Sequence, residues 1–217
     1  MTGPVSRVAI VHGPWKDPSR LVVCQHRGMP AGPEFVRPPR AHQGPIRLVP
    51  PDARWARQYA DVAARIRHAL GPVAVVVEHV GSTSVPGLAA KPFIDVLLLV
   101  PDPGDEAAYV PDLEAAGFLL HVREPDWHQH RFFRSQDPEV QIHVFAVGSE
   151  EAERMLLFRD RLRTHEDERT LYEETKRRLA AESWSRIQDY ADAKSEVVEE
   201  IIARAGEGSP GPHRRPG

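Results

Sequence analysis

Cysteine is almost absent from this chain of 217 residues, in which Cys24 is the only one. An intramolecular disulfide is therefore impossible, and a reducing, cytoplasmic setting is the simplest expectation. The sequence also lacks an apolar run of membrane-spanning length, and its N-terminus lacks the hydrophobic core of a signal peptide. These absences favour a cytoplasmic protein without a membrane partner.

An excess of charge of one sign is lacking too. The 28 Lys and Arg side chains are set against 31 Asp and Glu, which gives a formal net charge of −3. This balance gives no strong signal for nucleic-acid binding, which relies on a basic surface. Hydrophobic residues make up 41% of the chain, enough to bury a sizeable core, and one domain with tails fits this length better than two domains.

Both ends of the chain are rich in proline and glycine. Residues 1–45 and residues 206–217 lack a periodic apolar face, so we expect both to be disordered. The short apolar run Leu21–Cys24 offers an alternative for part of the first segment, as an added edge strand. The sequence therefore predicts one compact domain over residues 46–205.

The domain is organised around residues 73–100. Two apolar runs rich in β-branched residues, Val73–Val77 and Phe93–Val100, are too short for independent helices and are predicted to be buried strands. Between them lies a hinge of small residues, Gly81–Ser84, which offers backbone N–H groups and hydroxyls to an anion. Asp95 then interrupts the second apolar strand.

Asp95 has two interpretations. A carboxylate buried in a strand must be paired, protonated or bound to a metal, because an unpaired buried charge is costly. Alternatively, Asp95 lies at the end of the strand and accepts hydrogen bonds from the hinge amides. A small-residue turn together with a strand carboxylate favours a site for phosphate and a metal ion.

The remaining pattern predicts an α+β fold. A helix is expected from Asp52 to Gly71 and a short one over 106–116, followed by strands over 118–122, 130–134 and 140–147. From Ser149 the apolar period becomes helical, with helices predicted after Ser149, over 166–181 and over 185–205. A mixed sheet followed by a helical pack is typical of α+β proteins.

The central motif resembles a known family. The run HVGSTSVPGLAAKPFID from His79 to Asp95, with Trp127, HRFF (130–133), IHV (142–144) and FRD (158–160) downstream, is similar to the uncharacterised GrpB family (UPF0157). The resemblance covers about residues 46–205. That family is placed in the nucleotidyltransferase superfamily, so the resemblance implies a mixed β-sheet flanked by helices and metal-dependent transfer of a nucleotidyl group from a nucleoside triphosphate to an unknown acceptor.

The chain departs from the superfamily pattern at one decisive place. Gly81, Ser82 and Asp95 match the pattern, but Leu97 stands where a second metal-binding acid is expected, and His143 is the nearest candidate for a third. A single carboxylate is a poor site for two magnesium ions. Two alternatives therefore stay open: a non-catalytic domain that binds a nucleotide or another phosphate ligand, and a His/Asp metal-dependent hydrolase. Whether the protein is an enzyme stays open with them.

The candidate site residues fall into three sets: catalytic residues, metal ligands and phosphate contacts. Asp95 and His143 are the candidate catalytic residues, and Asp95, His79, His130 and His143 are candidate ligands of a magnesium, manganese or zinc ion, since imidazole suits the softer metals. The alternative for each histidine is a hydrogen-bonded strand residue. The expected partner is a nucleoside triphosphate or another phosphate-bearing small molecule, for which the candidate contacts are Gly81, Ser82, Ser84, Lys91, Arg131, Lys176 and Lys194.

These phosphate contacts also have plain structural alternatives. Serine hydroxyls after a strand are ordinary turn and cap residues, and most surface arginines, including Arg131, are solvated. Lys194 lies within the apolar stripe of the last predicted helix, between Tyr190 and Val197, so its side chain points inward or extends its stem toward solvent.

Overall fold

The computed structural model describes residues 32–38, 46–136, 138–184 and 187–207. Its strands are β1 (Glu34–Phe35), β2 (Val76–Val80), β3 (Ile94–Val100), β4 (Leu119–Glu124), β5 (His130–Gln136) and β6 (Glu139–Ala146). Its helices are α1 (Arg54–Leu70), α2 (Val110–Ala115), α3 (Glu150–Thr164), α4 (Glu166–Ala180), α5 (Ile187–Asp192) and α6 (Ser195–Glu207).

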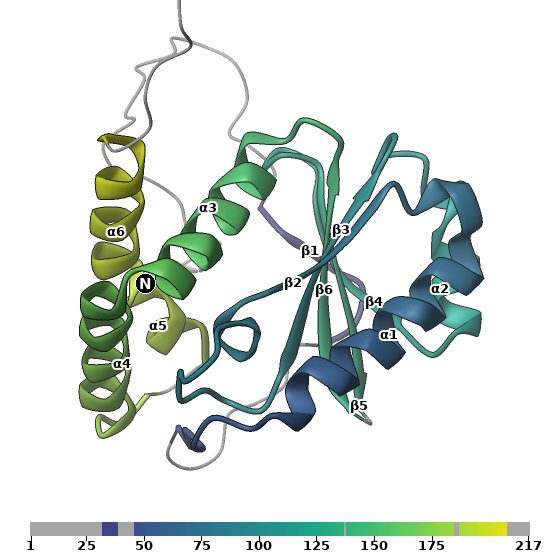
Figure 1. Cartoon of the computed structure of the whole chain (residues 1–217). Helices are drawn as coiled ribbons and strands as arrows, with labels where there is room; N and C mark the ends of the chain where they lie inside the picture. The colour runs from purple at the N-terminus through teal and green to yellow at the C-terminus, as the bar shows by residue number, and fades with distance from the viewer. Residues whose placement is uncertain (1–31, 39–45, 137, 185–186, 208–217) are drawn as a thin grey trace, which may run out of the picture.

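The described strands form one mixed sheet in the order β1-β4-β5-β6-β3-β2. The β3 and β6 pair is parallel, and the other neighbours are antiparallel. Helices α1 and α2 lie on one side of the sheet, and α3 to α6 lie on the other (Figure 1). The predicted α+β architecture, a mixed sheet followed by a helical pack, is confirmed.

The two faces of β3 belong to two different cores, because successive side chains in a strand point to opposite faces. Val96 and Leu98 pack in the main core against the buried stripe of α1, which includes Val62 and Ile66. Leu97 and Leu99 face the other way and pack with Phe145 and Ala152 beneath α3. Asp95 shares the parity of Leu97 and so lies on the face that α3 partly covers.

The C-terminal helices are tied to the segment that links β2 and β3. Val85 and Leu88 of that segment share a core with residues of α3, α4 and α6, namely Phe158, Leu162, Tyr172, Val197, Val198, Ile201 and Ile202. Burying these side chains gives the hydrophobic free energy that holds the helical pack against the hinge. Residues far apart in sequence are thereby brought to the end of β2.

Most predicted elements agree with the structure to within two residues, and three differ more. The first central strand begins at Val76 rather than Val73, because Gly71–Val73 form a short 3₁₀ turn after α1. The helix predicted over 106–116 is divided into a 3₁₀ turn and α2. Pro111 lies at the start of α2, and because proline has no backbone N–H it cannot donate a hydrogen bond to the preceding turn. The last helix is interrupted between α5 and α6, where Asp192 and Ser195 favour helix ends over helix interiors.

The segment predicted to be disordered contains a strand that sequence reasoning missed. Glu34 and Phe35 of β1 pair with Arg123 and Val122 of β4. Arg123 also forms an ion pair with Glu34 at 2.9 Å. Two residues are too few to show a period, so no sequence pattern indicated them. The proposed strand at Leu21–Cys24 lies outside the described residues.

Within the described parts of the chain, no helix combines the length and the apolar character needed to cross a lipid bilayer.

The role of β1 is testable by truncation. Deleting residues 1–45 removes the β1 pairing and the Arg37–Glu114 ion pair, which we expect to lower the free energy of unfolding by about 1–2 kcal/mol. The melting temperature should fall by roughly 2–6 °C relative to a deletion of residues 1–31 alone, which keeps β1. Equal melting temperatures for the two truncated proteins would contradict a stabilising role for β1.

Candidate functional site

The site begins where β2 ends. Val80 pairs with Asp95 across the β2–β3 ladder, and Gly81 follows with φ at +67°, a left-handed conformation that favours glycine. A Cβ atom on Gly81 would lie 2.2 Å from Oδ2 of Asp95. The carboxylate of Asp95 therefore packs directly against the hinge, at the strand end.

Three lysines from separate parts of the chain surround this point. Lys176 of α4 is only 2% exposed, and its Nζ donates to Oγ of Ser82 at 3.2 Å and to the carbonyl of Ala89. Lys194, at the junction of α5 and α6, and Lys91, ahead of β3, both approach the ring of Tyr190, with Nζ 4.8 and 5.1 Å from its centroid. We call Gly81, Ser82, Lys91, Asp95, Lys176 and Lys194 the hinge–lysine site.

Burial and mutual repulsion shift the titration of these groups. Burial, reinforced by the charge of Lys194, lowers the pKa of Lys176 to about 7 and that of Lys91 to about 8. Burial also lowers the pKa of Lys194 to about 8, which the charge of Asp95 opposes. Burial raises the pKa of Asp95 to about 6, although Lys91 and Lys194 act to lower it. The site thus holds more positive charge than its own carboxylate neutralises.

Lysine and arginine have different roles in this protein. Four of the 28 basic residues are lysines, and three of those four meet in the hinge–lysine site. Arg131, Arg159 and Arg161 form ion pairs with carboxylates at 2.6 to 2.8 Å. Lys91, Lys176 and Lys194 form no ion pair with a carboxylate among the residues that the structure describes. Their charges are left available to an external anion.

Two tyrosines complete the site and were missed from the sequence. Tyr172 is buried, and burial raises its pKa to about 12, although the nearby hydroxyl of Ser82 acts to lower it. The hydroxyl of Tyr190 is buried and has no hydrogen-bond partner in the described parts of the chain. Each tyrosine precedes a lysine by four residues, and each ring lies beneath that lysine, at 4.9 and 4.8 Å. This repeated Tyr-x-x-x-Lys spacing was the signal available in the sequence.

The arrangement suits an anion better than a metal pair. Ammonium groups, a serine hydroxyl and the backbone at a glycine turn are typical phosphate ligands. Asp95 has Gln141 beside it on β6 and Leu97 two residues on, and neither supplies a carboxylate. The described residues contain no group of three or more His, Cys, Asp or Glu side chains placed to hold a metal ion. The donor set does not fit a two-metal centre.

His79 does not join the site. It pairs with Val96, so it points to the α1 face of the sheet, opposite to Asp95. There its ring stacks on Tyr59 with centroids 4.6 Å apart, and its Nε2 lies 3.1 Å from Oγ1 of Thr83. Burial and the charges of nearby arginines lower its pKa to about 4. The predicted grouping of His79 with Asp95 is wrong because adjacent strand residues face opposite ways.

Arg131 and Ser84 are also engaged elsewhere. Arg131 pairs with Val144 of β6, on the α1 face, and its guanidinium forms an ion pair with Glu106 at 2.6 Å. The hydroxyl of Ser84 is buried and donates to the carbonyl of Gly81 at 2.6 Å, which closes the hinge turn. Both are structural residues rather than phosphate contacts.

His143 and His130 lie on the same sheet face as Asp95 but not in contact with it. His143 pairs with Leu97, so it is two residues along and one strand across from Asp95, which puts their Cα atoms about 8 Å apart. His130 uses both ring nitrogens, one with Glu124 at 2.8 Å and one with His143 at 3.2 Å. It therefore has no nitrogen left for a metal ion.

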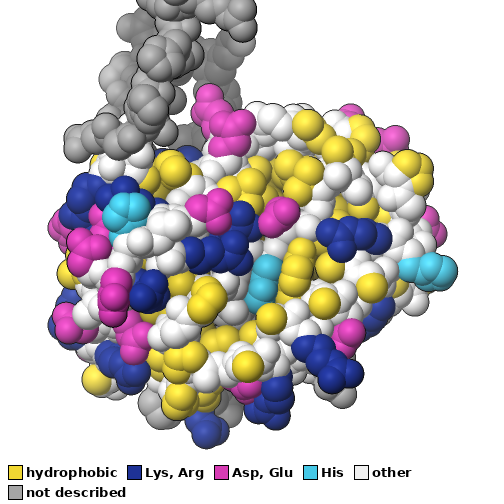
Figure 2. Space-filling model, in the orientation of Figure 1, with side chains coloured by type: hydrophobic (Ala, Val, Ile, Leu, Met, Phe, Trp, Pro, Cys, Tyr) yellow, Lys and Arg dark blue, Asp and Glu magenta, His cyan; other side chains and the backbone are white. Residues whose placement is uncertain are grey.

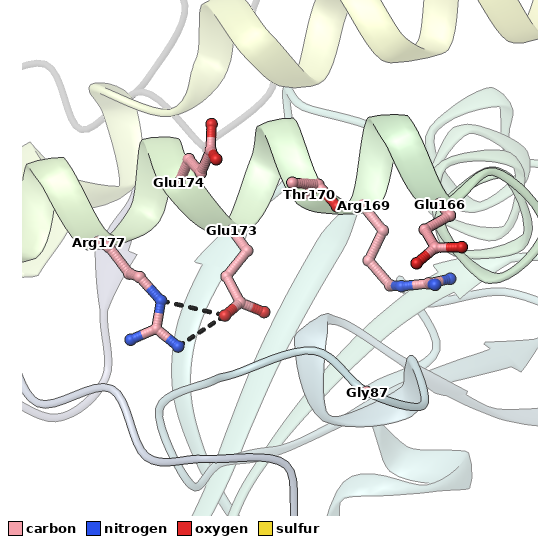
Figure 3. Close-up of a pocket in the computed structure, with 7 residues that line it drawn as sticks. All are labelled: Gly87, Glu166, Arg169, Thr170, Glu173, Glu174 and Arg177. Atoms are coloured by element: carbon pink, nitrogen blue, oxygen red, sulfur yellow. Dashed lines mark hydrogen bonds and ion pairs between the residues drawn. The ribbon is translucent and has the colours of Figure 1, made fainter.

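Charged side chains of both signs and a hollow beside α4 lie outside the hinge–lysine site. Positive and negative side chains are interspersed over the face shown in Figure 2. A hollow of about 610 Å³ lies between α4 and the turn at Gly87 (Figure 3). None of the predicted site residues lines it, and its charges partly neutralise each other, as in the Glu173–Arg177 pair at 2.6 Å.

Two glycine substitutions test the packing of Asp95 against the hinge. Gly81 and Gly87 both have positive φ, but a Cβ atom meets Asp95 only at Gly81 and nothing within 4 Å at Gly87. Gly81→Ala should therefore lower the free energy of unfolding by about 1–3 kcal/mol more than Gly87→Ala, in chemical denaturation. Adding Asp95→Ala should remove most of this difference. Equal losses for the two single variants would contradict the contact.

Comparison with known proteins gives consistent matches. Residues 45–204 match the family model described as GrpB protein. A UPF0157 protein of Halalkalibacterium halodurans is 51% identical over 166 residues, covering 76% of this chain and 85% of that protein. A UPF0157 protein of Streptomyces coelicolor is 48% identical over 155 residues, covering 71% and 81%.

A solved structure and a longer relative extend the comparison. The crystal structure of conserved protein GrpB from Enterococcus faecalis matches with a TM-score of 0.63 and 26% identity, covering 74% of this chain and 98% of that one. A dephospho-CoA kinase of Mycolicibacterium paratuberculosis is 32% identical over 190 residues, covering 75% of this chain but 46% of that protein. From the family model and the two UPF0157 relatives, this chain belongs to the GrpB family.

Proposed function

We propose that the hinge–lysine site binds the phosphate groups of a small molecule, with a nucleoside triphosphate as the leading candidate. The observation that carries this proposal is the convergence of Lys91, Lys176 and Lys194 without carboxylate partners. Lys176 is buried and Lys91 and Lys194 are partly buried. Three such cations close together destabilise a ligand-free protein, since burial and repulsion both raise their free energy. A phosphate group removes that cost by supplying negative charge and several hydrogen-bond acceptors.

The choice of lysine supports the same conclusion. In a chain with many arginines, lysine appears where a compact ammonium can donate to several oxygens from a confined position. Lys176 already donates to Ser82 and Ala89, which fixes its ammonium at the hinge. The ring of Tyr190 lies under both Lys91 and Lys194, and its buried hydroxyl is a donor without a partner among the described residues. The partial match to a protein named dephospho-CoA kinase is in keeping with a phosphate-bearing ligand.

Nucleotidyl transfer is the second candidate, and Asp95 is the observation that favours it. Its carboxylate lies against Gly81, beside the expected position of the phosphates. Leu97 is fully buried beneath α3, and no second carboxylate takes its place, so binding ranks ahead of transfer. A His/Asp metal hydrolase ranks lower, because His79 faces the other side and His130 is fully hydrogen-bonded.

Lysine substitutions test the binding proposal. Lys176→Met and Lys194→Met each remove one site cation, whereas Arg178→Met removes an exposed cation of α4 whose nearest ion pair is at 3.7 Å. We expect the first two variants to bind sodium tripolyphosphate and nucleoside triphosphates at least tenfold more weakly in isothermal titration calorimetry, and Arg178→Met to bind like the wild type. Equal affinity in all four proteins would overturn the proposal.

Asp95→Asn separates the two candidate functions in the same assay. For a binding domain, the substitution removes a negative charge beside three cations, so phosphate affinity should rise several-fold. For a nucleotidyltransferase, it should abolish release of pyrophosphate from each nucleoside triphosphate, whatever its effect on affinity. Turnover that persists undiminished in Asp95→Asn would rule out the catalytic role.

The lysine pKa values also predict a pH dependence. Phosphate binds the protonated lysines, so affinity should fall as the pH rises through about 7 to 8. Stability of the ligand-free protein should change the opposite way. Lysines in the unfolded chain keep their protons up to about pH 10, whereas the site lysines of the folded protein lose them above about pH 7 to 8. The free energy of unfolding should therefore increase as the pH rises from about 7 to 10. Calorimetry and denaturant titrations across this range check both trends, and Lys176→Met should weaken both.

A further inference from the structure

A chain of hydrogen bonds runs across the strands beside the hinge–lysine site. Oε2 of Glu124 lies 2.8 Å from Nδ1 of His130, and Nε2 of His130 lies 3.2 Å from Nδ1 of His143. Glu124 and His130 are 8% and 4% exposed, so water does not compete effectively for these bonds. The chain leads from the β4–β5 connection to the central strand β6.

The hydrogen-bond partners determine where the protons lie. A carboxylate only accepts hydrogen bonds, so Nδ1 of His130 carries the proton that it donates to Glu124. Burial lowers the pKa of His130, so its ring is neutral and its Nε2 is an acceptor. The proton between the two rings therefore belongs to Nδ1 of His143. A neutral His143 then has an unprotonated Nε2.

This nitrogen is held in place and is free. The ring of His143 lies against Phe132 at 5.2 Å, and the ring of His130 stacks on Phe145 at 4.7 Å. Nε2 of His143 has no hydrogen-bond partner among the described residues. Among the described residues, the fully buried side-chain atoms without a hydrogen-bond partner are Ser149 Oγ, Glu151 Oε1 and Tyr190 OH, and Nε2 of His143 is not one of them. It is therefore not fully buried, and the hydrogen bond at Nδ1 fixes it as an acceptor.

We propose that His143 is a specificity-determining residue whose Nε2 accepts a hydrogen bond from an N–H or O–H group on the organic part of the phosphate ligand, with Glu124 and His130 as positioning residues. The inference rests on the proposed function, because it needs a ligand anchored at the hinge–lysine site. His143 lies on the same sheet face as Asp95, with Cα atoms about 8 Å apart, within the span of a nucleotide.

Under this proposal, binding of the phosphate groups depends on pH, whereas the hydrogen bond from the organic part of the ligand to His143 does not. Burial lowers the pKa of His143 to about 3, so this acceptor stays neutral through the range in which the lysines titrate. Recognition of the donor is then constant while phosphate binding changes. An analogue that lacks the N–H or O–H donor leaves Nε2 of His143 without a hydrogen-bond partner, so it should bind more weakly than a ligand that has the donor.

Nitrogen-15 NMR of the full chain tests the proton positions directly. Long-range ¹H–¹⁵N spectra should show His143 as the neutral tautomer protonated at Nδ1, from pH 6 to 8. His130→Phe removes the acceptor for that proton, so His143 should shift toward the tautomer protonated at Nε2. A wild-type His143 protonated at Nε2 would overturn the proposal, because its outward nitrogen would then be a donor.

Binding measurements test what the acceptor recognises. Sodium tripolyphosphate carries only the phosphate groups, and the four ribonucleoside triphosphates add donors. We expect at least one nucleotide to bind the wild type tenfold or more tightly than tripolyphosphate. His143→Phe should lose that gain and keep the affinity for tripolyphosphate, and His143→Gln, whose amide oxygen is an acceptor, should restore part of it.

The remaining outcomes are distinct. If tripolyphosphate binds but no nucleotide binds more tightly, or if His143→Phe keeps the gain, the role of His143 is wrong while the phosphate site stands. If His143→Phe weakens tripolyphosphate and nucleotides equally, His143 acts on the fold alone, and the proposal fails. If neither probe binds the wild type, the proposed function itself fails.

Discussion

The close approach of Asp95 to the backbone of Gly81 is the constraint on which the site depends. A Cβ atom would be 2.2 Å from the carboxylate oxygen, so no other residue fits at the hinge without moving Asp95. The same turn directs Val85 and Leu88 into the core shared by α3, α4 and α6. One tight turn thus fixes the carboxylate, the hydroxyl of Ser82 and the docking position of the helices that carry Lys176 and Lys194.

Arginine and lysine have different structural roles in this protein. Arginine forks pair with carboxylates and hold elements together, as Arg159 does between α3 and Glu78 of β2. The lysines of the site are buried or partly buried, and they form no such ion pair among the described residues, an arrangement that lowers stability. Family membership fixes the fold, whereas the activity has to be argued from these side chains, because one fold hosts many functions.

The sequence predicted the architecture and much of the site, for identifiable reasons. Long periodic helices and valine-rich strands have strong local signals, and the spacing from Gly81 to Asp95 placed hinge and carboxylate at one strand end. His79 and Arg131 were grouped with the site because they are close to it in sequence or chemically suited to it, but each points to the opposite face of the sheet, since successive strand residues alternate between faces. The roles of Glu124 and Tyr172 depend on contacts between distant segments, for which local sequence has no signal.

The interruption between α5 and α6 has a mechanical consequence. It lifts Lys194 out of a regular helix and sets it at a joint, while Lys176 stands on α4 and Lys91 on the sheet side of the molecule. The three cationic side chains thus come from three separate parts of the chain, namely α4, the α5–α6 junction and the segment ahead of β3. Under the proposed function, an anion bound among them links the C-terminal helices to the sheet through its contacts with these charges.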